Sequence, residues 1–365
     1  MKGGPAIPGP AASRRPVTTD CCQALEALVP VGPLSRRAFL ARLAGLTLAG
    51  LAWPRRVWAQ ERRKVTLGFC GQLLCVVPYE VARHHGYFAE QGLDVELVYF
   101  RGGSAAMQAL VGGAVDYAAT SFDVALAAYA RGARIVRFFT TGRLPLFALA
   151  TAPGMAGQLR TVADLRGRTV GVSALGNADH LLALALLRRA RVRPDAVRFA
   201  VLGPNLFDAL RVGHVDAGMV QEPAATLLVR AGGRVLVNLM DLEQARRHLG
   251  GPYEFMGVAV RREEWARREG EMRALARALT RSLRLIHFGT PRLVVEALPP
   301  ALIAGGDRAL FEEILARHRR SLYPQDGRIQ WDAARRVLFV QQQSGVLPGT
   351  VDLADLLSNA VVERL

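Results

Sequence analysis

Short apolar runs alternate with longer amphipathic stretches from residue 62 to the C-terminus. Runs typical of strands fall at 65–69, 94–99, 117–119, 135–140, 146–151, 169–172, 197–201, 217–220 and 253–260. Helical periodicity is seen at 78–86, 178–190, 272–287, 310–322 and 331–340. Short continuous apolar runs are typical of strands buried on both faces, and their alternation with helices predicts an α/β fold with mostly parallel sheets.

Two stretches that lie 100 residues apart share one skeleton. In each copy an apolar helix ends at a glycine, the residue that best tolerates a left-handed turn, and a short apolar strand follows. The residues Ala109, Leu110, Gly113, Val115 and Asp116 recur as Ala209, Leu210, Gly213, Val215 and Asp216. Two such units predict two α/β lobes of similar construction, with a ligand held between strand ends and helix starts.

The order of the elements gives the expected domain boundaries. We expect residues 62–152 to form the first part of lobe one, including the strand at 146–151. Residues 153–248 would form lobe two. Residues 249–365 would return a strand to lobe one and add C-terminal helices that support it. The chain would then cross twice between the lobes, and two crossovers make a hinge.

We expect the first 59 residues to be an N-terminal extension with an export signal. Ser35-Arg36-Arg37-Ala38-Phe39-Leu40 precedes a moderately apolar run at 43–53, and Val57-Trp58-Ala59 offers small residues for a signal peptidase. This pattern resembles a Tat signal peptide and predicts a periplasmic or other extracytoplasmic protein. A membrane anchor is the alternative, but the apolar run is short and Arg55-Arg56 follow it closely.

The composition suits a globular protein with no nucleic-acid partner. The 365 residues are 51% hydrophobic, which is enough for two cores, and the formal net charge is +16. The arginines are scattered along helices and are not interleaved with aromatic residues, as a nucleic-acid platform would require. With Lys64 the only lysine beyond the N-terminal segment, lysine Schiff-base chemistry has almost no candidate residue.

Two cysteines remain outside the N-terminal segment. Cys70 and Cys75 follow the first predicted strand. We expect free or buried thiols, with a disulfide or a metal site as the alternatives, although nothing nearby clearly supplies further metal ligands.

A resemblance to a known family rests on several blocks. The stretch 81–95, VARHHGYFAEQGLDV, resembles a block of the NMT1/THI5-like and SsuA-like periplasmic solute-binding proteins. Both Gly-x-Val-Asp motifs, the stretch at 164–172, Gln221-Glu222-Pro223 and Val351-Asp352-Leu353 extend it over most of the chain. The resemblance implies a two-lobed type II periplasmic binding fold and a monomer without a cofactor. It also implies delivery of a small molecule, such as a sulfonate, taurine, nitrate or a thiamine-pyrimidine precursor, to an ABC transporter permease.

The expected ligand contacts lie on loops that open helices or close strands. Backbone N–H groups at a helix start attract anionic groups, which favours the starts near Gly103 and Ser173. Glu222 would suit a ligand with a donor or a positive group, whereas Arg143 would pair with a carboxylate or sulfonate or lie on the surface. The full predicted set is Gln72, Gly103, Ser104, Thr120, Ser121, Phe122, Arg143, Ser173, Asn177, Asn205, Gln221 and Glu222.

Motifs of the common enzyme classes are missing from the sequence. It contains no Walker loop, no Gly-x-Gly-x-x-Gly and no His-Glu-x-x-His. We therefore predict a binding protein. Two alternatives stay open: an enzyme on the same scaffold, similar to the pyrimidine-precursor synthases of the family, and a ligand-sensing partner of a signalling receptor.

Overall fold

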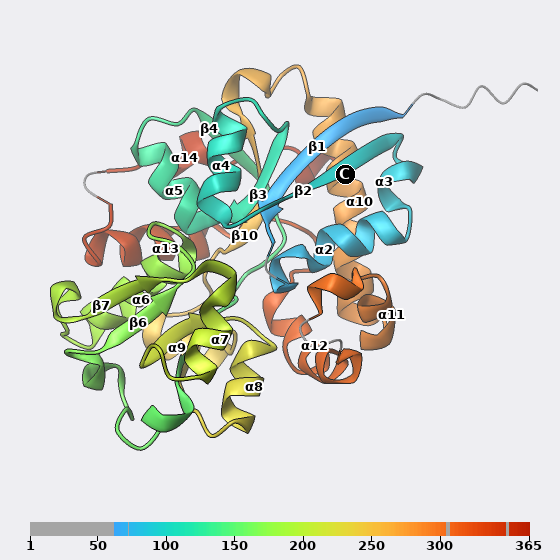
Figure 1. Cartoon of the computed structure of the whole chain (residues 1–365). Coiled ribbons are helices and arrows are strands. Elements are labelled where there is room, and N and C mark those ends of the chain that lie inside the picture. Colours follow the sequence, from blue (N-terminus) through green and yellow to red (C-terminus); the bar gives the residue numbers. More distant parts are fainter. Residues whose placement is uncertain (1–61, 72, 304–306, 348–349) are drawn as a thin grey trace, which may run out of the picture. The chain divides into compact units, whose positions relative to one another are not determined.

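Two five-stranded sheets of the same design organise the protein (Figure 1). The computed structural model describes residues 62–71, 73–303, 307–347 and 350–365, so the predicted signal at 1–59 and Gln72 lie outside the described residues. The first sheet has the order β2-β1-β3-β10-β4 and the second has the order β7-β6-β8-β5-β9. Their strands are β1 (Arg63–Cys70), β2 (Leu93–Phe100), β3 (Tyr117–Ser121), β4 (Ile135–Thr140), β5 (Ala148–Thr151), β6 (Thr169–Val172), β7 (Arg198–Val201), β8 (Ala217–Val220), β9 (Val235–Asn238) and β10 (Met256–Arg261).

Each sheet takes one antiparallel strand from the crossover between the lobes. β10 follows the last element of lobe two in sequence and pairs with β3 and β4 of the first sheet. β5 pairs with β8 and β9 and thus belongs to the second sheet. The assignment of the strand at 146–151 to lobe one is therefore wrong. The first crossover is the segment 141–147, ahead of the predicted boundary at residue 152, and the hydrogen-bonding partners of β5 lie later in the sequence.

The repeated motif has the same role in both lobes. Gly113 and Gly213 adopt left-handed backbone angles, with φ of 79° and 77°. Asp116 accepts a hydrogen bond from the Thr66 N–H at 2.8 Å, and Asp216 accepts one from the Thr169 N–H at 2.7 Å. Each aspartate therefore anchors the neighbouring parallel strand, β1 at Thr66 and β6 at Thr169.

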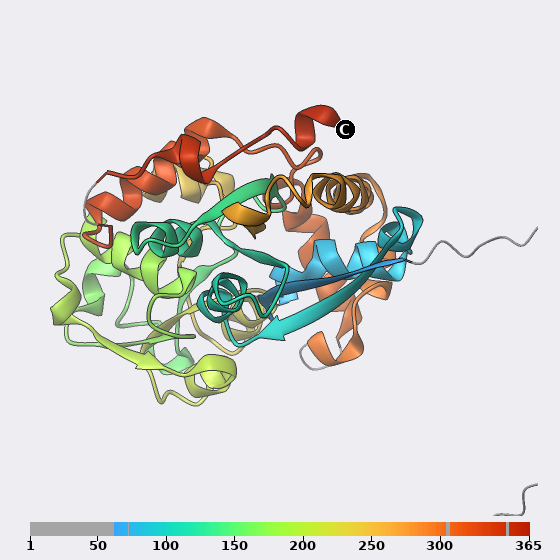
Figure 2. The ribbon, with the colours of Figure 1, turned by 90° about the horizontal axis from the view of Figure 1, so that it is seen from above.

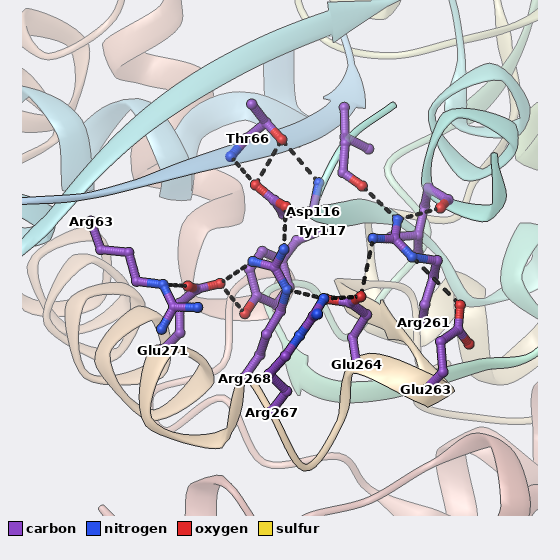
Figure 3. Close-up of polar contacts among 12 residues, drawn as sticks. Arg63, Thr66, Asp116, Tyr117, Arg261, Glu263, Glu264, Arg267, Arg268 and Glu271 are labelled. Atoms are coloured by element: carbon purple, nitrogen blue, oxygen red, sulfur yellow. Dashed lines mark hydrogen bonds and ion pairs between the residues drawn. The ribbon is translucent and has the colours of Figure 1, made fainter. Parts of the chain in front are cut away.

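A network of charges extends this anchor in lobe one (Figure 3). Arg268 donates to Asp116 at 2.6 Å and to Glu271 at 2.7 Å, and Glu271 accepts from the Tyr117 hydroxyl at 2.6 Å. Arg63 forms an ion pair with the same Glu271. The network lies where β1 and β3 begin, at the end of the sheet opposite to their carboxyl ends.

Helices cover the sheets and tie the C-terminal part to lobe one. The helices are α2 (Leu73–His84), α3 (Tyr87–Glu90), α4 (Gly103–Val111), α5 (Phe122–Ala130), α6 (Ala178–Arg189), α7 (Leu206–Arg211), α8 (Ala224–Arg230), α9 (Leu242–Leu249), α10 (Glu269–Phe288), α11 (Pro291–Glu296), α12 (Arg308–Leu322), α13 (Trp331–Gln343) and α14 (Leu353–Leu356). α10 packs against α2 and is seen nearly end-on in Figure 2, and α13 contacts both α5 of lobe one and α6 of lobe two. Among the described helices, none combines the length and apolar character that a membrane crossing needs.

Helix α2 begins earlier than the predicted start at Pro78. A proline inside a helix leaves the carbonyl four residues earlier without its usual partner. Here that carbonyl, of Leu74, accepts a hydrogen bond from the Tyr323 hydroxyl at 2.8 Å. The carbonyl of Pro78 itself accepts from the Ser282 hydroxyl at 2.6 Å. Side chains from the C-terminal half thus stabilise a helix that the local sequence disfavours.

The two crossovers pair with each other and form the hinge. The Thr141 N–H donates to the Met256 carbonyl at 2.8 Å, and the Phe255 N–H donates to the Gly142 carbonyl at 3.0 Å. The returning segment also carries Tyr253 and Glu254, both fully buried.

Both of these hinge side chains point into lobe one. Tyr253 donates to Asp123 at 2.6 Å, and Glu254 forms an ion pair with Arg137 at 3.1 Å. Gln341 of α13 also donates to Asp123. A buried polar cluster therefore joins the hinge to lobe one and to α13.

Candidate functional site

A small cavity lies between the two lobes where strands end and helices begin. It leaves about 20 Å³ for the centre of a water molecule, little more than one water needs. Lobe one contributes Cys70, Cys75, Gly102, Gly103, Ser121 and Val124, lobe two contributes Ser173, Asn177, Ala178 and Asp179, and the crossovers contribute Phe147, Phe255 and Met256. This position, at the carboxyl ends of strands from both sheets, is the one that α/β folds use for ligands.

A second, wider cavity adjoins the first and opens toward solvent. It measures about 540 Å³ and shares Gly102, Ser173 and Asn177 with the small one. Ser104 and Asn205, both predicted site residues, line it together with Arg101. We call the small cavity the inner cavity and the wider one the outer cavity.

Asn177 of lobe two binds the helix start of lobe one. Its Oδ1 accepts a hydrogen bond from the Ser104 N–H at 3.1 Å, and the Ser104 hydroxyl donates to the Gly176 carbonyl at 3.0 Å. The Asn177 amide in turn donates to the Ser173 hydroxyl at 3.0 Å. A Cβ on Gly102 would lie 2.1 Å from the Asn177 amide nitrogen, so only glycine leaves room for this approach. The helix starts expected to face a ligand therefore also hold the lobes together.

The helix start of lobe two already contains an acid. Asp179 is 1% exposed, in the first turn of α6, and accepts hydrogen bonds from both the N–H and the hydroxyl of Ser173. Burial raises the pKa of this carboxyl, while the bonds from Ser173 oppose the rise. A carboxylate at this position offsets the positive end of the helix, so α6 attracts an anionic ligand less than a bare helix start would.

Two buried thiols face the inner cavity from lobe one. Cys70 and Cys75 are both free, and the Gln221 amide of lobe two donates to the Cys75 sulfur at 3.5 Å. Burial raises the pKa of the Cys75 thiol well above its usual range. Cys75 is therefore an uncharged, soft surface at neutral pH and a poor nucleophile.

The loop at the start of α5 contributes residues both to the inner cavity and to the core of lobe one. Ser121 lines the inner cavity and accepts from the Val124 N–H at 3.3 Å, as a helix cap. Thr120 and Phe122 are buried and do not line either cavity. The Arg137 guanidinium lies 5.3 Å from the centre of the Phe122 ring. This ring therefore packs inside lobe one against a cation and does not face a ligand.

Arg143 and Glu222 point away from both cavities. Arg143 donates to the carbonyls of Arg320 at 2.6 Å and Ser321 at 3.3 Å, which lie at the end of α12. Its charge therefore stabilises a helix C-terminus. Glu222 accepts from the N–H of Thr226 at 2.9 Å and from its hydroxyl at 3.0 Å, so the carboxylate caps the first turn of α8.

Several residues that line the inner cavity could not be predicted from the sequence. Phe147, Phe255 and Met256 lie on the crossovers, and their approach depends on the two sheets exchanging strands. Asp179 had a visible signal, because an acid in the first turn of a predicted helix often faces that helix start. The spacing of Cys70 and Cys75 bears on free thiols, a disulfide or a metal site, and it carries no signal for a ligand-facing surface.

The fold and the interlobe cavity define a class, the two-lobed α/β proteins of the periplasmic binding type. Within this class the chain belongs to the NMT1/THI5-like family, whose model matches residues 76–286. The chain has no match among curated protein sequences.

Solved structures give the same architecture. A protein from Bordetella bronchiseptica RB50 is 25% identical, with a TM-score of 0.76 over 83% of this chain and 97% of that one. The alkanesulfonate-binding protein SsuA from Xanthomonas axonopodis pv. citri, solved bound to MOPS, is 21% identical, with a TM-score of 0.64 over 82% and 99%. The nitrate-binding protein NrtA from Synechocystis PCC 6803 is 12% identical, with a TM-score of 0.66 over 83% and 88%.

The fold also occurs in an enzyme. The desulfurization enzyme DszB is 17% identical, with a TM-score of 0.55 over 83% of this chain and 98% of that one. The architecture alone therefore does not separate a binding protein from an enzyme.

Proposed function

We propose that the protein is an exported solute-binding protein that closes two lobes around a small molecule and delivers it to an ABC transporter permease. The observation that carries the proposal is the inner cavity, which both lobes and both crossovers line. Family membership supports it, as do the binding proteins among its structural neighbours. The twin-arginine segment at 36–37 supports export through the Tat pathway.

The residues proposed to hold the solute are the polar groups that face the two cavities. Ser121, Ser173 and Asn177 offer hydroxyl and amide groups to the inner cavity, and Gly103 brings the backbone of α4 close to it. Ser104 and Asn205 line the entrance. Phe147 and Phe255, whose rings meet edge to face at 6.2 Å, supply an apolar wall at the hinge.

Thermal-shift measurements on the full-length protein test the binding role. The panel holds sulfonates, taurine, nitrate, amino acids and pyrimidines, because a compound that binds the native state raises the melting temperature by mass action. A cell extract added without fractionation covers solutes outside the panel. A protein that neither the panel nor the extract stabilises would not be a solute receptor.

An enzyme on the same scaffold is the second candidate, because the fold of DszB is the same. The raised pKa of Cys75 disfavours a thiolate mechanism at the cavity. Mass spectrometry of a stabilising solute after incubation with the protein distinguishes the two functions. Unchanged solute supports a receptor, whereas conversion with turnover establishes an enzyme.

A further inference from the structure

The lining of the inner cavity is informative about the charge of the solute. Of the residues that line it, the one with an acidic or basic side chain is Asp179, and arginine, lysine and histidine do not occur among them. An anion enclosed there loses its water without gaining an opposite charge, and it lies close to a carboxylate. The desolvation cost of an anion remains if Asp179 is protonated, because the lining still offers the anion no positive charge.

Three arginines lie close in sequence to residues of the inner cavity or were predicted to line it, but none of them lines it. Arg143 donates to two carbonyls at the end of α12. Arg137 is 1% exposed and donates to Glu254 at 3.1 Å, to the Phe255 carbonyl at 2.8 Å and to the Thr120 carbonyl at 3.3 Å. Arg101 lines the outer cavity, where it is exposed and water screens its charge.

The backbone donor expected to attract an anion also has a partner. The Ser104 N–H at the start of α4 donates to the Asn177 amide oxygen. On the opposite side, the start of α6 is offset by Asp179. The two helix dipoles that would favour an anion are thus both partly satisfied by groups of lobe two.

The remaining lining favours an apolar body that carries donors. Cys70, Cys75 and Met256 present sulfur, and Phe147 and Phe255 present rings, all of which favour polarisable apolar groups. The hydroxyl oxygens of Ser121 and Ser173 and the carboxyl of Asp179 accept hydrogen bonds at the same surface. An N–H group on the solute would meet these acceptors.

We infer that this cavity, once the lobes part to admit a solute, selects a compact uncharged or cationic compound with N–H donors on an apolar body, such as an amide, an amidine or an amine, and rejects sulfonates, nitrate and other anions. This inference rests on the proposed binding role and narrows it. It assigns Asp179 as the residue that sets the charge preference.

A series of compounds with one shape and different charge tests the inference. Benzamidine, benzamide and benzoate are titrated calorimetrically into the full-length protein. We expect benzamidine or benzamide to bind at least about tenfold more tightly than benzoate, because desolvation and repulsion by Asp179 both weaken the binding of benzoate. Benzoate binding as tightly as either of the other two would overturn the inference.

Charge-sorted pools of a cell extract decide the question if the series is too large for the cavity. The extract is divided on ion exchangers into anionic, neutral and cationic pools, and each is tested for thermal stabilisation. Stabilisation by the neutral or cationic pool supports the inference, and stabilisation confined to the anionic pool overturns it while leaving the binding role intact. Stabilisation by none of the pools contradicts the binding role itself.

The variant Asp179→Asn isolates the carboxylate. The amide keeps an acceptor for the Ser173 N–H but carries no charge, so we expect the preference for benzamidine over benzoate to fall about fivefold or more. The matched control is Asp216→Asn, which removes an acid of lobe two that binds Thr169 and Arg168 and lines neither cavity. An equal loss of preference in both variants would remove Asp179 from the role.

Discussion

The two lobes repeat one backbone plan but differ in what they bury. β4 and β9 occupy the same place in their sheets, and the strands lie 100 residues apart. The position of Arg137 in β4 is held by Val237 in β9, and the position of Asp123 corresponds to Pro223. Lobe one therefore buries charges where lobe two buries apolar or rigid residues.

This difference shows which lobe holds the hinge. The charges of lobe one contact Tyr253 and Glu254 of the returning crossover. The corresponding crossover into lobe two ends with Leu146 and Phe147 ahead of β5, and both are buried and uncharged. The hinge is therefore fixed to lobe one by polar contacts.

The largest expected effect comes from making lobe one resemble lobe two at the ion pair. Arg137→Val leaves Glu254 buried without its charge partner, so we expect the free energy of unfolding to fall by about 3 to 5 kcal/mol. Urea denaturation measures it. The double variant Arg137→Met with Glu254→Gln leaves no charge unpaired. We expect it to recover at least half of the free energy of unfolding that Arg137→Val loses. A loss below about 1 kcal/mol for Arg137→Val would show that the pair does not hold the hinge.

Asp123 gives lobe one a pH dependence that Pro223 cannot give lobe two. Burial raises the pKa of Asp123 to about 6 from the ordinary 3.8, although bonds from Tyr253 and Gln341 oppose the rise. Its contribution to stability is therefore present below pH 3.8 and is lost as the pH rises through about 6.

The variant Asp123→Asn removes this titration. From pH 4 to pH 8 we expect the stability of the variant to rise relative to the parent by about 2.5 kcal/mol, somewhat less than the full equivalent of the pKa difference, because part of the titration lies below pH 4. Urea denaturation at several pH values checks it. A constant difference between the two proteins over that range would contradict the assignment.

Gly102 permits a contact that its counterpart in lobe two, Leu202, does not offer. A methyl group at position 102 would collide with Asn177, so Gly102→Ala should weaken the two interlobe hydrogen bonds of Ser104. We expect the free energy of unfolding, measured by urea denaturation, to fall by about 1 to 2 kcal/mol. In an Asn177→Ala background the same change should cost nearly nothing. Gly154→Ala is the control, because a Cβ there has no atom within 4 Å. Equal costs in both backgrounds would exclude the collision.

The smallest effect is expected at Glu222, which follows β8 as Phe122 follows β3. Its carboxylate is bound to Thr226 and lies 4.0 Å from His318 of α12. Glu222→Gln should therefore change the affinity for a stabilising solute by less than about twofold, measured by calorimetry. A loss of tenfold or more would return Glu222 to the binding site.

The scaffold could be predicted from sequence because its signals are local or repeated. Gly113 and Gly213 mark equivalent helix ends, and the apolar runs mark the strands. The sheet membership of β5 could not be predicted, because a strand next to lobe one in sequence pairs with strands that follow it by about 70 to 90 residues. The early start of α2 depends on the Tyr323 hydroxyl, which also lies far away in the sequence.

The lining of the inner cavity could be predicted where helix starts determine it, and could not where the fold brings distant segments together. Gly103, Ser121, Ser173 and Asn177 line the inner cavity because they stand at strand ends or helix starts. Arg143 and Glu222 also stand near such ends, but α12 and α8 offer them closer partners. A polar residue in the right loop can therefore satisfy a helix end instead of a ligand, and sequence does not distinguish the two.

A crystal structure of the full-length protein with the compound purified from the stabilising pool tests the central claim most directly. The account predicts the compound in the inner cavity, between Cys75, Gly103 and Asp179, with an N–H group toward the acceptors of lobe two. A compound bound elsewhere, or an anionic group enclosed beside Asp179, would contradict it.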